Sequence, residues 1–282
     1  MQEPTVADLF ESLSAIVLLS NTAQHPISYH PKNAKMEVEM IDTATALTSF
    51  LDGLPQASAQ PNLFIDLEGN NLSRHGTLSL ITILVEPRHT VHLVDVHALG
   101  KDAFTTSNTN NTTTLQQILE SENITKVFFD IRHDSDALFG LYGIRVSSIE
   151  DLQLMELASR SVLFENKRYV SGLAKCIQSY SQLSVAEKQQ FKATKELGGR
   201  LFDPACGGSY AVFDQRPLDP EVSKYCAQDV SHMPGLYDVF HAKLGAIWKA
   251  KVKKETAARI ALSQSAQGVS RGPQNAQGPK GW

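Results

Sequence analysis

The chain has 282 residues, of which 42% are hydrophobic and 20% are charged. This composition suits one large globular domain and excludes a chain that is disordered throughout. Because 26 Lys and Arg stand against 30 Asp and Glu, the net charge of −4 excludes bulk positive charge as a means of holding nucleic acid, so any polyanion must be bound locally.

The first 35 residues predict a partly helical extension, with an amphipathic helix over 7–19 and a polar loop over 20–35. The apolar stretch Ala15–Leu19 is short, and no basic residue precedes it, so it is a poor signal peptide. No run of 18 apolar residues occurs, which excludes a transmembrane helix. The three cysteines form no CxxC pair. We therefore expect an intracellular protein that is not secreted and has no membrane partner, and we leave nucleus and cytoplasm open.

The next part of the chain alternates between expected strands and short helices. Apolar and β-branched content predicts strands over 36–41, 62–67, 77–85, 90–96, 126–129 and the start of 148–160. Helices are expected over 43–51, 115–121, 135–142 and the remainder of 148–160, with a linker over 53–61 and an exposed loop over 105–114. Short gaps between the second, third and fourth strands indicate an antiparallel meander. The fold class is therefore α/β with a mixed sheet.

Beyond residue 160 the chain is expected to be mainly helical as far as 263. A long loop rich in Gly and Pro is predicted over 197–218. A basic helical extension follows at 249–263. The stretch 264–282 is rich in Gly, Gln and Pro with little apolar content, which predicts a disordered tail.

Acidic residues stand at three unusual places. Asp66 and Glu68 follow a strongly apolar strand, and their i, i+2 spacing places them on one face. Asp134 lies at the start of a helix between Asp130 and Asp136. Asp229 lies four residues after Tyr225, on the same face of a helix that begins at Asp219–Pro220. Each has an ordinary alternative, namely a strand that ends in solvent, a helix cap, or a Tyr–Asp hydrogen bond.

Taken together, the acids predict a metal site. Four carboxylates in one pocket cannot all ionise without a cation, and hard oxygen ligands select Mg²⁺ or Mn²⁺. Two such ions can activate water and stabilise the leaving oxygen of a phosphoryl displacement.

In these motifs the sequence resembles the DEDD 3′-to-5′ exonucleases of the RNase D type, in the subclass with Tyr in the last motif. The motifs are FIDLEG with Asp66 and Glu68, KVFFDIRHDSDAL with Asp134, and YCAQD with Tyr225 and Asp229. The stretch LEGNNLSRHG and the Arg-Pro-Leu at 216–218 are similar to the branch that includes Egalitarian and its exonuclease-domain relatives. The resemblance covers about residues 36–245 and implies a ribonuclease H-like fold, a mixed sheet of about five strands flanked by helices, with a mainly helical C-terminal half.

The resemblance also implies roles for these residues. Asp66, Glu68 and Asp229 would hold the ion that activates the attacking water. Asp66 would bridge to a second ion that Asp134 helps to hold, partly through water, and Tyr225 would orient the water. His133 is expected to be a surface or helix-cap residue.

Three further residues are candidates for nucleic-acid binding: Arg74, His75 and Arg216. A solvated loop is the alternative for Arg74 and His75, and pairing with an acid that orders the loop is the alternative for Arg216.

The sequence thus predicts a two-metal 3′-5′ exonuclease over 36–248 that releases nucleoside 5′-monophosphates from single-stranded ends, RNA more than DNA. The alternative is an adaptor built on the nuclease fold that holds RNA or a protein without cutting. A protein partner is expected to use the N-terminal helix or the 197–218 loop.

Overall fold

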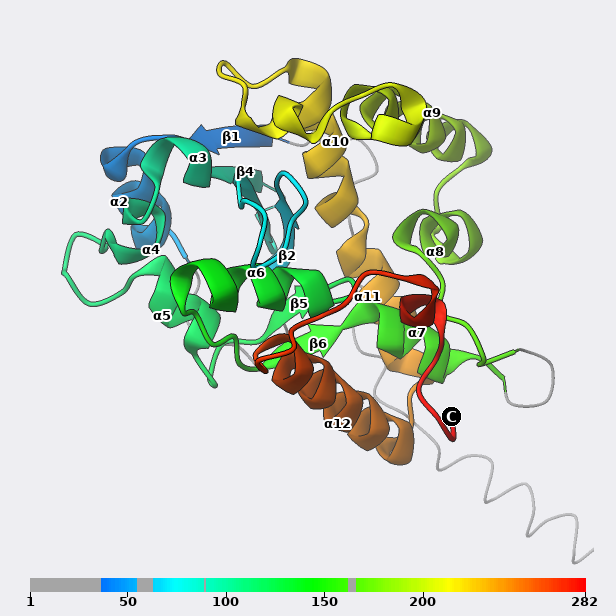
Figure 1. Ribbon diagram of the computed structural model, residues 1–282. Coiled ribbons are helices and arrows are strands. Elements are labelled where there is room, and N and C mark those ends of the chain that lie inside the picture. The colour runs from blue at the N-terminus through cyan, green and yellow to red at the C-terminus, as the bar shows by residue number, and fades with distance from the viewer. Residues whose placement is uncertain (1–36, 55–62, 89, 162–165) are drawn as a thin grey trace, which may run out of the picture. The chain divides into compact units, whose positions relative to one another are not determined.

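A mixed six-stranded sheet forms the centre of the computed structural model, which describes residues 37–54, 63–88, 90–161 and 166–282 (Figure 1). The strands are β1 (Glu37–Ile41), β2 (Leu63–Glu68), β3 (Leu80–Val85), β4 (Thr90–Asp95), β5 (Lys126–Phe128) and β6 (Ile149–Asp151). Their order across the sheet is β1-β4-β3-β2-β5-β6. The predicted mixed α/β sheet is confirmed, whereas the expected helix over 7–19 and loop over 20–35 lie outside the described residues.

The antiparallel meander predicted from the short gaps is present in β2, β3 and β4. β1 joins β4 in parallel, and β5 and β6 continue the sheet in parallel from β2. Strand β2 therefore lies inside the sheet and stays paired to its end, where Glu68 is opposite Leu80. The acids of this strand consequently belong to the sheet and do not follow it into a solvent-exposed loop.

Each face of the sheet is covered by a layer of helices. One layer contains α2 (Ala44–Asp52), α4 (Asp102–Thr105), α5 (Leu115–Glu120) and α6 (Arg132–Tyr142). The other contains α7 (Leu152–Ser159), α8 (Leu173–Tyr180), α9 (Val185–Phe202), α10 (Pro220–Ser231) and α11 (Met233–Lys243). Since side chains alternate along β2, Ile65 and Leu67 pack toward the first layer and Phe64 toward the second. Asp66 and Glu68 share the parity of Phe64 and so face the layer that holds α10.

Helix α10 begins where the sequence predicts. The Asp219 side chain accepts a 2.7 Å hydrogen bond from the backbone N–H of Glu221, and Pro220 occupies the first turn. The helix then packs against β2, β3 and β4 (Figure 1). A capped start fixes which turn of α10 meets the sheet, and so where Tyr225 and Asp229 lie.

The predicted loop over 197–218 is wrong at its start, because α9 continues to Phe202. The remainder contains two short 3₁₀ helices, η1 (Pro204–Cys206) and η2 (Tyr210–Asp214). Two successive glycines favour a loop in the sequence, but in the fold Gly198 serves helix packing. A Cβ at this position would lie 2.4 Å from Cδ2 of Tyr225, so only glycine lets α9 approach α10 this closely.

The predicted disordered tail over 264–282 is also wrong, because the segment docks on the domain. Gln277 forms a β-bridge with Tyr169, and the Arg132 guanidinium donates a 2.9 Å hydrogen bond to the carbonyl of Asn275. The ring of Trp282 packs on that of Trp248, with 5.6 Å between centroids. A low apolar content predicts disorder, but here backbone carbonyls of the segment accept hydrogen bonds from buried side chains of the domain.

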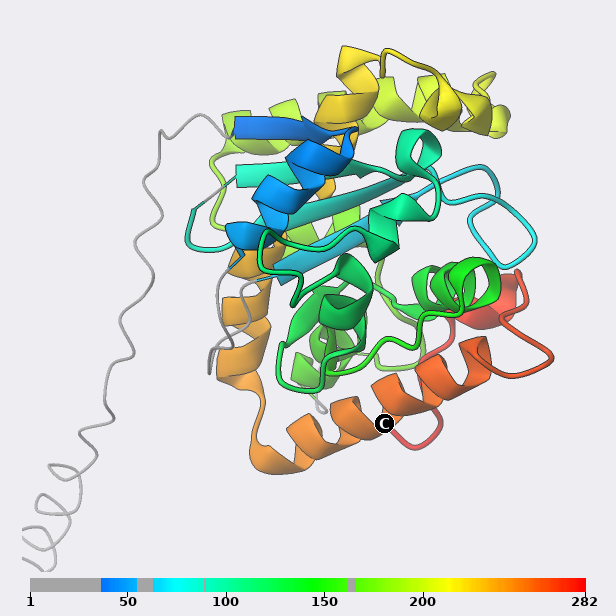
Figure 2. The same ribbon diagram turned by 90° about the vertical axis from the view of Figure 1, so that its left-hand side faces the viewer.

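The basic stretch before this tail forms α12 (Ala246–Ser263), which contacts α6, α7 and β6. Figure 2 shows α12 lying beside α6. Residues 36–282 make up one compact unit. The remaining described helices are α3 (Val96–Leu99) and the 3₁₀ helix η3 (Pro273–Ala276). Among the described residues, none of these helices is both long and apolar enough to cross a lipid bilayer.

Candidate active site

The structure brings Asp66 and Glu68 of β2 together with Asp229 of α10. Each contributes a carboxylate oxygen to a group whose members lie within 4.8 Å of one another. The two strand residues share a face because they are two positions apart, and α10 carries Asp229 onto that face. Three carboxylates from distant parts of the sequence therefore converge on one point, which we call the carboxylate trio.

Electrostatics makes the trio costly in its charged form. Burial, and then the neighbouring Asp229, raises the pKa of Asp66 to about 7. Burial, followed by the charges of Asp66 and Asp229, raises the pKa of Glu68 well above its ordinary value. Burial likewise raises the pKa of Asp229. A group of acids that resist ionisation together is one that a bound cation would stabilise.

The trio fits a divalent metal ion. Asp229 is 4% exposed, and its Oδ1 atom is buried with no hydrogen-bond partner among the described residues. An unpaired buried carboxylate oxygen is rare, because it carries the full cost of desolvation. An ion at this place would satisfy it, and an all-carboxylate donor set suits Mg²⁺ or Mn²⁺.

Asp134 lies in the first turn of α6, outside the trio, and is 6% exposed. Its pKa is raised well above the ordinary value, first by burial and then by the charge of Asp66. Its two acidic neighbours are paired with arginines. Asp130 is bound by Arg132 at 2.5 Å and Asp136 by Arg74 at 2.8 Å. Of these three acids, Asp134 is therefore the one without an arginine partner among the described residues.

Tyr225 lies at the edge of the trio beside Lys195 of α9. The Lys195 ammonium donates hydrogen bonds to the Tyr225 hydroxyl at 2.9 Å and to Asp229 Oδ2 at 2.5 Å. It also lies 4.0 Å from the centroid of the Tyr225 ring. Sequence reasoning missed Lys195, because its spacing to these partners matches no motif and lysines are common on solvent-exposed helices.

The candidate nucleic-acid-binding residues lie in different settings. The Arg74 guanidinium donates hydrogen bonds to Asp136 and to the carbonyls of Ser263 and Ser265, which favours a structural role. Arg216 binds Asp95 and two loop carbonyls, as its alternative interpretation expects. His75 is exposed in the loop after β2. Their contact with nucleic acid stays a prediction.

His133, expected at the surface or at a helix cap, lies in the first turn of α6 beside Asp134 and is half-buried, and the N-cap is Ile131. Burial lowers its pKa, and its Nδ1 atom has no hydrogen-bond partner among the described residues.

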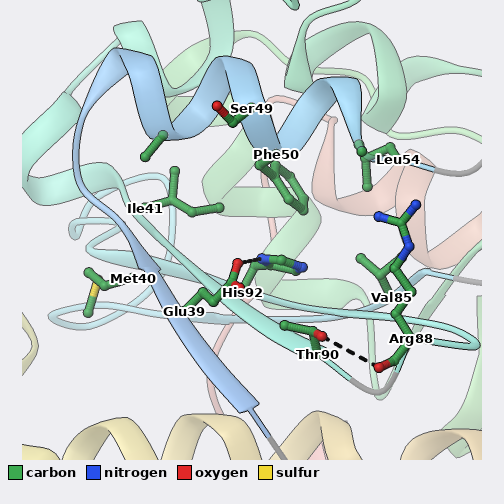
Figure 3. Close-up of a pocket in the computed structure, with 12 residues that line it drawn as sticks. Glu39, Met40, Ile41, Ser49, Phe50, Leu54, Val85, Arg88, Thr90 and His92 are labelled. Carbon is green, nitrogen blue, oxygen red and sulfur yellow. Dashed lines mark hydrogen bonds and ion pairs between the residues drawn. The ribbon is translucent and has the colours of Figure 1, made fainter.

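A separate cavity of about 560 Å³ lies on the opposite face of the sheet (Figure 3). It is lined by α2, β1 and β4, and the close-up shows the imidazole of His92 directed at Glu39, 3.1 Å from its carboxylate. The Phe50 ring covers the same histidine. Because this cavity is on the face of Ile41 and Phe50, it does not open onto the carboxylate trio.

The raised pKa of Asp66 predicts a pH effect on stability. The unfolded chain releases this proton near pH 4, whereas the native chain holds it to about pH 7. Between these values the native state binds more protons, so the free energy of unfolding should fall as the pH rises. Urea unfolding in EDTA from pH 4.5 to 7.5 measures this decline, which should be shallower in Asp66→Asn. Equal slopes in the two proteins would contradict the assignment.

Comparisons with known proteins all indicate the same family. A family model for 3′-5′ exonucleases matches residues 38–244. The piRNA biogenesis protein EXD1 of Mus musculus is 35% identical over 176 residues, or 62% of this chain and 28% of that protein. EXD1 of Homo sapiens is 29% identical over 173 residues, or 61% of this chain and 30% of that protein. The chain thus spans less than a third of the length of these two relatives.

Solved structures share the fold. RNase D of Trypanosoma brucei in complex with GMP has a TM-score of 0.62 at 22% identity, covering 84% of this chain and 67% of that one. The same enzyme in complex with RNA U12 has a TM-score of 0.61 at 21% identity, covering 84% and 74%. The matched region of the family model includes the trio, Asp134 and Tyr225.

Proposed function

The chain belongs to the 3′-5′ exonuclease family, and we propose that it is a divalent-metal-dependent enzyme that removes nucleotides from single-stranded 3′ ends. The observation that carries the proposal is the carboxylate trio with its unpaired Asp229 oxygen, beside Tyr225. Three converging carboxylates with one buried oxygen left unpaired are costly for the fold, but they are what a metal-dependent phosphodiester hydrolase needs.

Each residue has a separate task in this proposal. Asp66, Glu68 and Asp229 would hold one divalent ion, and Asp134 together with Asp66 would help to hold a second. Bound Mg²⁺ or Mn²⁺ would supply an activated water and would stabilise the negative charge on the leaving oxygen. The Tyr225 hydroxyl holds the attacking water in line with the terminal phosphodiester. The 3′-hydroxyl of the penultimate nucleotide leaves, and a nucleoside 5′-monophosphate is released.

RNA is the proposed substrate in preference to DNA. The support comes from the relatives, since the EXD1 proteins are named for piRNA biogenesis and the RNase D structure holds RNA U12. Lys195 is the candidate for a contact with phosphate, because it is a cation at the edge of the trio and is 21% exposed. Protein partners stay a prediction.

Matched end-labelled RNA and DNA oligonucleotides test this proposal. With Mg²⁺ or Mn²⁺ we expect mononucleotides to be released from RNA, and to be released from DNA more slowly or not at all. In EDTA we expect no release from either substrate. The adaptor alternative predicts that RNA stays bound in EDTA while no product forms with any metal. Binding and cleavage are therefore measured on the same samples.

Tyr225→Phe should lower kcat by roughly 10- to 100-fold and leave KM within about twofold, because the hydroxyl acts on the attacking water and not on substrate binding. The ring keeps its packing, since it contacts Phe202 with 4.9 Å between centroids. Tyr210→Phe is the matched control, because Tyr210 stacks on the same phenylalanine away from the trio. Steady-state kinetics measures both. Equal losses in turnover and in RNA binding would show that Tyr225 is structural.

A further inference from the structure

Lys195 is a cation in direct contact with the carboxylate trio. Its ammonium is 2.5 Å from Asp229 Oδ2 and 2.9 Å from the Tyr225 hydroxyl. The Lys195 charge favours the ionised form of all three members of the trio, Asp66, Glu68 and Asp229. In the metal-free chain, Lys195 therefore supplies part of the positive charge that the trio requires.

The packing of α9 on α10 fixes this arrangement. Gly198 lies against the Tyr225 ring at a distance that admits no Cβ, and the Gln228 side chain donates a 3.1 Å hydrogen bond to the carbonyl of Phe191. Lys195 lies one turn before Gly198, and its ammonium lies over the face of the same ring. The ammonium thus reaches Asp229 from a helix that is held on both sides of it.

A metal ion and this ammonium compete for the same carboxylate. The ammonium binds Oδ2 of Asp229 while Oδ1 has no partner among the described residues, so an ion on Oδ1 would share one carboxylate with Lys195. A unit positive charge so close also repels a divalent ion, even at an effective dielectric constant near 20.

We propose that Lys195 is a built-in competitor of the metal ion, which neutralises Asp229 in the metal-free protein and must leave it before the site is fully loaded. The inference rests on the proposed function, because it concerns the metal of the same site. Its consequence is a site that binds metal more weakly than its carboxylates alone would, and that stays compact when no metal is bound.

An orienting role for Lys195 would have the opposite consequence. If the lysine served to aim Asp229 at the ion, its removal would weaken metal binding by roughly 10- to 100-fold, as for other groups that orient metal ligands. The repulsion between the Lys195 ammonium and a divalent ion outweighs the benefit of orienting Asp229. The structure therefore favours competition between Lys195 and the ion. The two roles differ in the sign of one measurement.

Titration of metal-free protein with Mn²⁺ in a calorimeter, without nucleic acid, provides that measurement. We expect Lys195→Met to bind Mn²⁺ at least about tenfold more tightly than wild type, and Lys195→Arg to bind like wild type. Lys192→Met is the matched control, since it removes the same charge one turn earlier, where Lys192 pairs with Glu196 near the surface. It should leave the affinity unchanged.

Lys195→Gln guards against poor folding of the methionine variant, because its side chain is polar and carries hydrogen-bond donors without a charge. This variant should also bind Mn²⁺ more tightly. If wild type binds Mn²⁺ and both Lys195→Met and Lys195→Gln bind it equally or more weakly, competition is overturned while the proposed function stands. If neither wild type nor the variants bind Mn²⁺ at a site that Asp66→Asn abolishes, both the inference and the proposed function fail.

Discussion

Asp66→Asn should reduce mononucleotide release by roughly 10³-fold. Asp66 interacts electrostatically with the acids on both sides of it. Its charge raises the pKa of Glu68 in the trio and the pKa of Asp134 outside the trio. In the proposed mechanism its loss would remove a ligand from each of two ions, and metal stabilisation of a transition state amounts to several kcal/mol. At 1.36 kcal/mol per tenfold change in rate, three powers of ten follow.

Single-turnover cleavage of end-labelled RNA in Mg²⁺ measures this loss. The fold should survive the substitution, since removing one of several crowded carboxylates relieves repulsion in the metal-free protein. Asp136→Asn is the control, at a position two residues after Asp134. Asp136 is buried and acidic but paired with Arg74, so its loss should lower stability and preserve turnover per folded molecule. Equal activity of Asp66→Asn and wild type would refute the enzyme proposal.

Arg259→Met should lower the free energy of unfolding by about 3 kcal/mol. Arg259 of α12 is 5% exposed and binds Asp151 at 2.8 Å and Asp130 at 3.3 Å. Asp151 is fully buried, so the substitution leaves a buried carboxylate without its cation, which is strongly destabilising. The loss is at the lower end of the usual range because backbone N–H groups of Ile131 and Gln153 still donate to Asp151.

Urea unfolding in EDTA measures this effect without a contribution from bound metal. Lys254→Met on the exposed side of α12 is the control, and should change the free energy of unfolding by no more than about 0.5 kcal/mol. If the two variants unfold alike, α12 is an appendage, as the sequence suggests, and not part of the domain.

The parts of the site that local pattern determines could be predicted from the sequence. The apolar run before Asp66 marks a buried strand, and the two-residue period places Glu68 on the same face. Asp219–Pro220 marks the start of α10, from which the i, i+4 spacing of Tyr225 and Asp229 follows. These features depend on neighbours within a few residues, so the sequence contains them explicitly.

The remaining parts depend on partners far away in the chain. Lys195 lies 34 residues before Asp229, and Arg259 lies 129 residues after Asp130. No periodicity connects such pairs, so neither the ammonium beside the trio nor the ion pairs that occupy Asp130 could be found without the fold. Gly198 favoured a loop in the sequence for the same reason. Its role in the fold is to leave space for the ring of Tyr225, which lies on another helix.

The docked tail illustrates the same limit. Its few apolar residues predict disorder, since they cannot offset the entropy of ordering the segment. In the structure its backbone carbonyls satisfy Arg132 and Arg74, whose side chains the domain has already oriented. Composition indicates how much apolar surface a segment can bury. It does not indicate whether the domain presents hydrogen-bond donors to the backbone carbonyls of that segment.

The most direct test of the proposed activity follows one RNA strand labelled at its 5′ end, with and without Mg²⁺. We predict a ladder that shortens one nucleotide at a time from the 3′ end, with nucleoside 5′-monophosphates as the released product, and no shortening in EDTA or with Asp66→Asn. Intact RNA that remains bound to the protein in every metal would contradict the proposal and would establish the non-cleaving adaptor in its place.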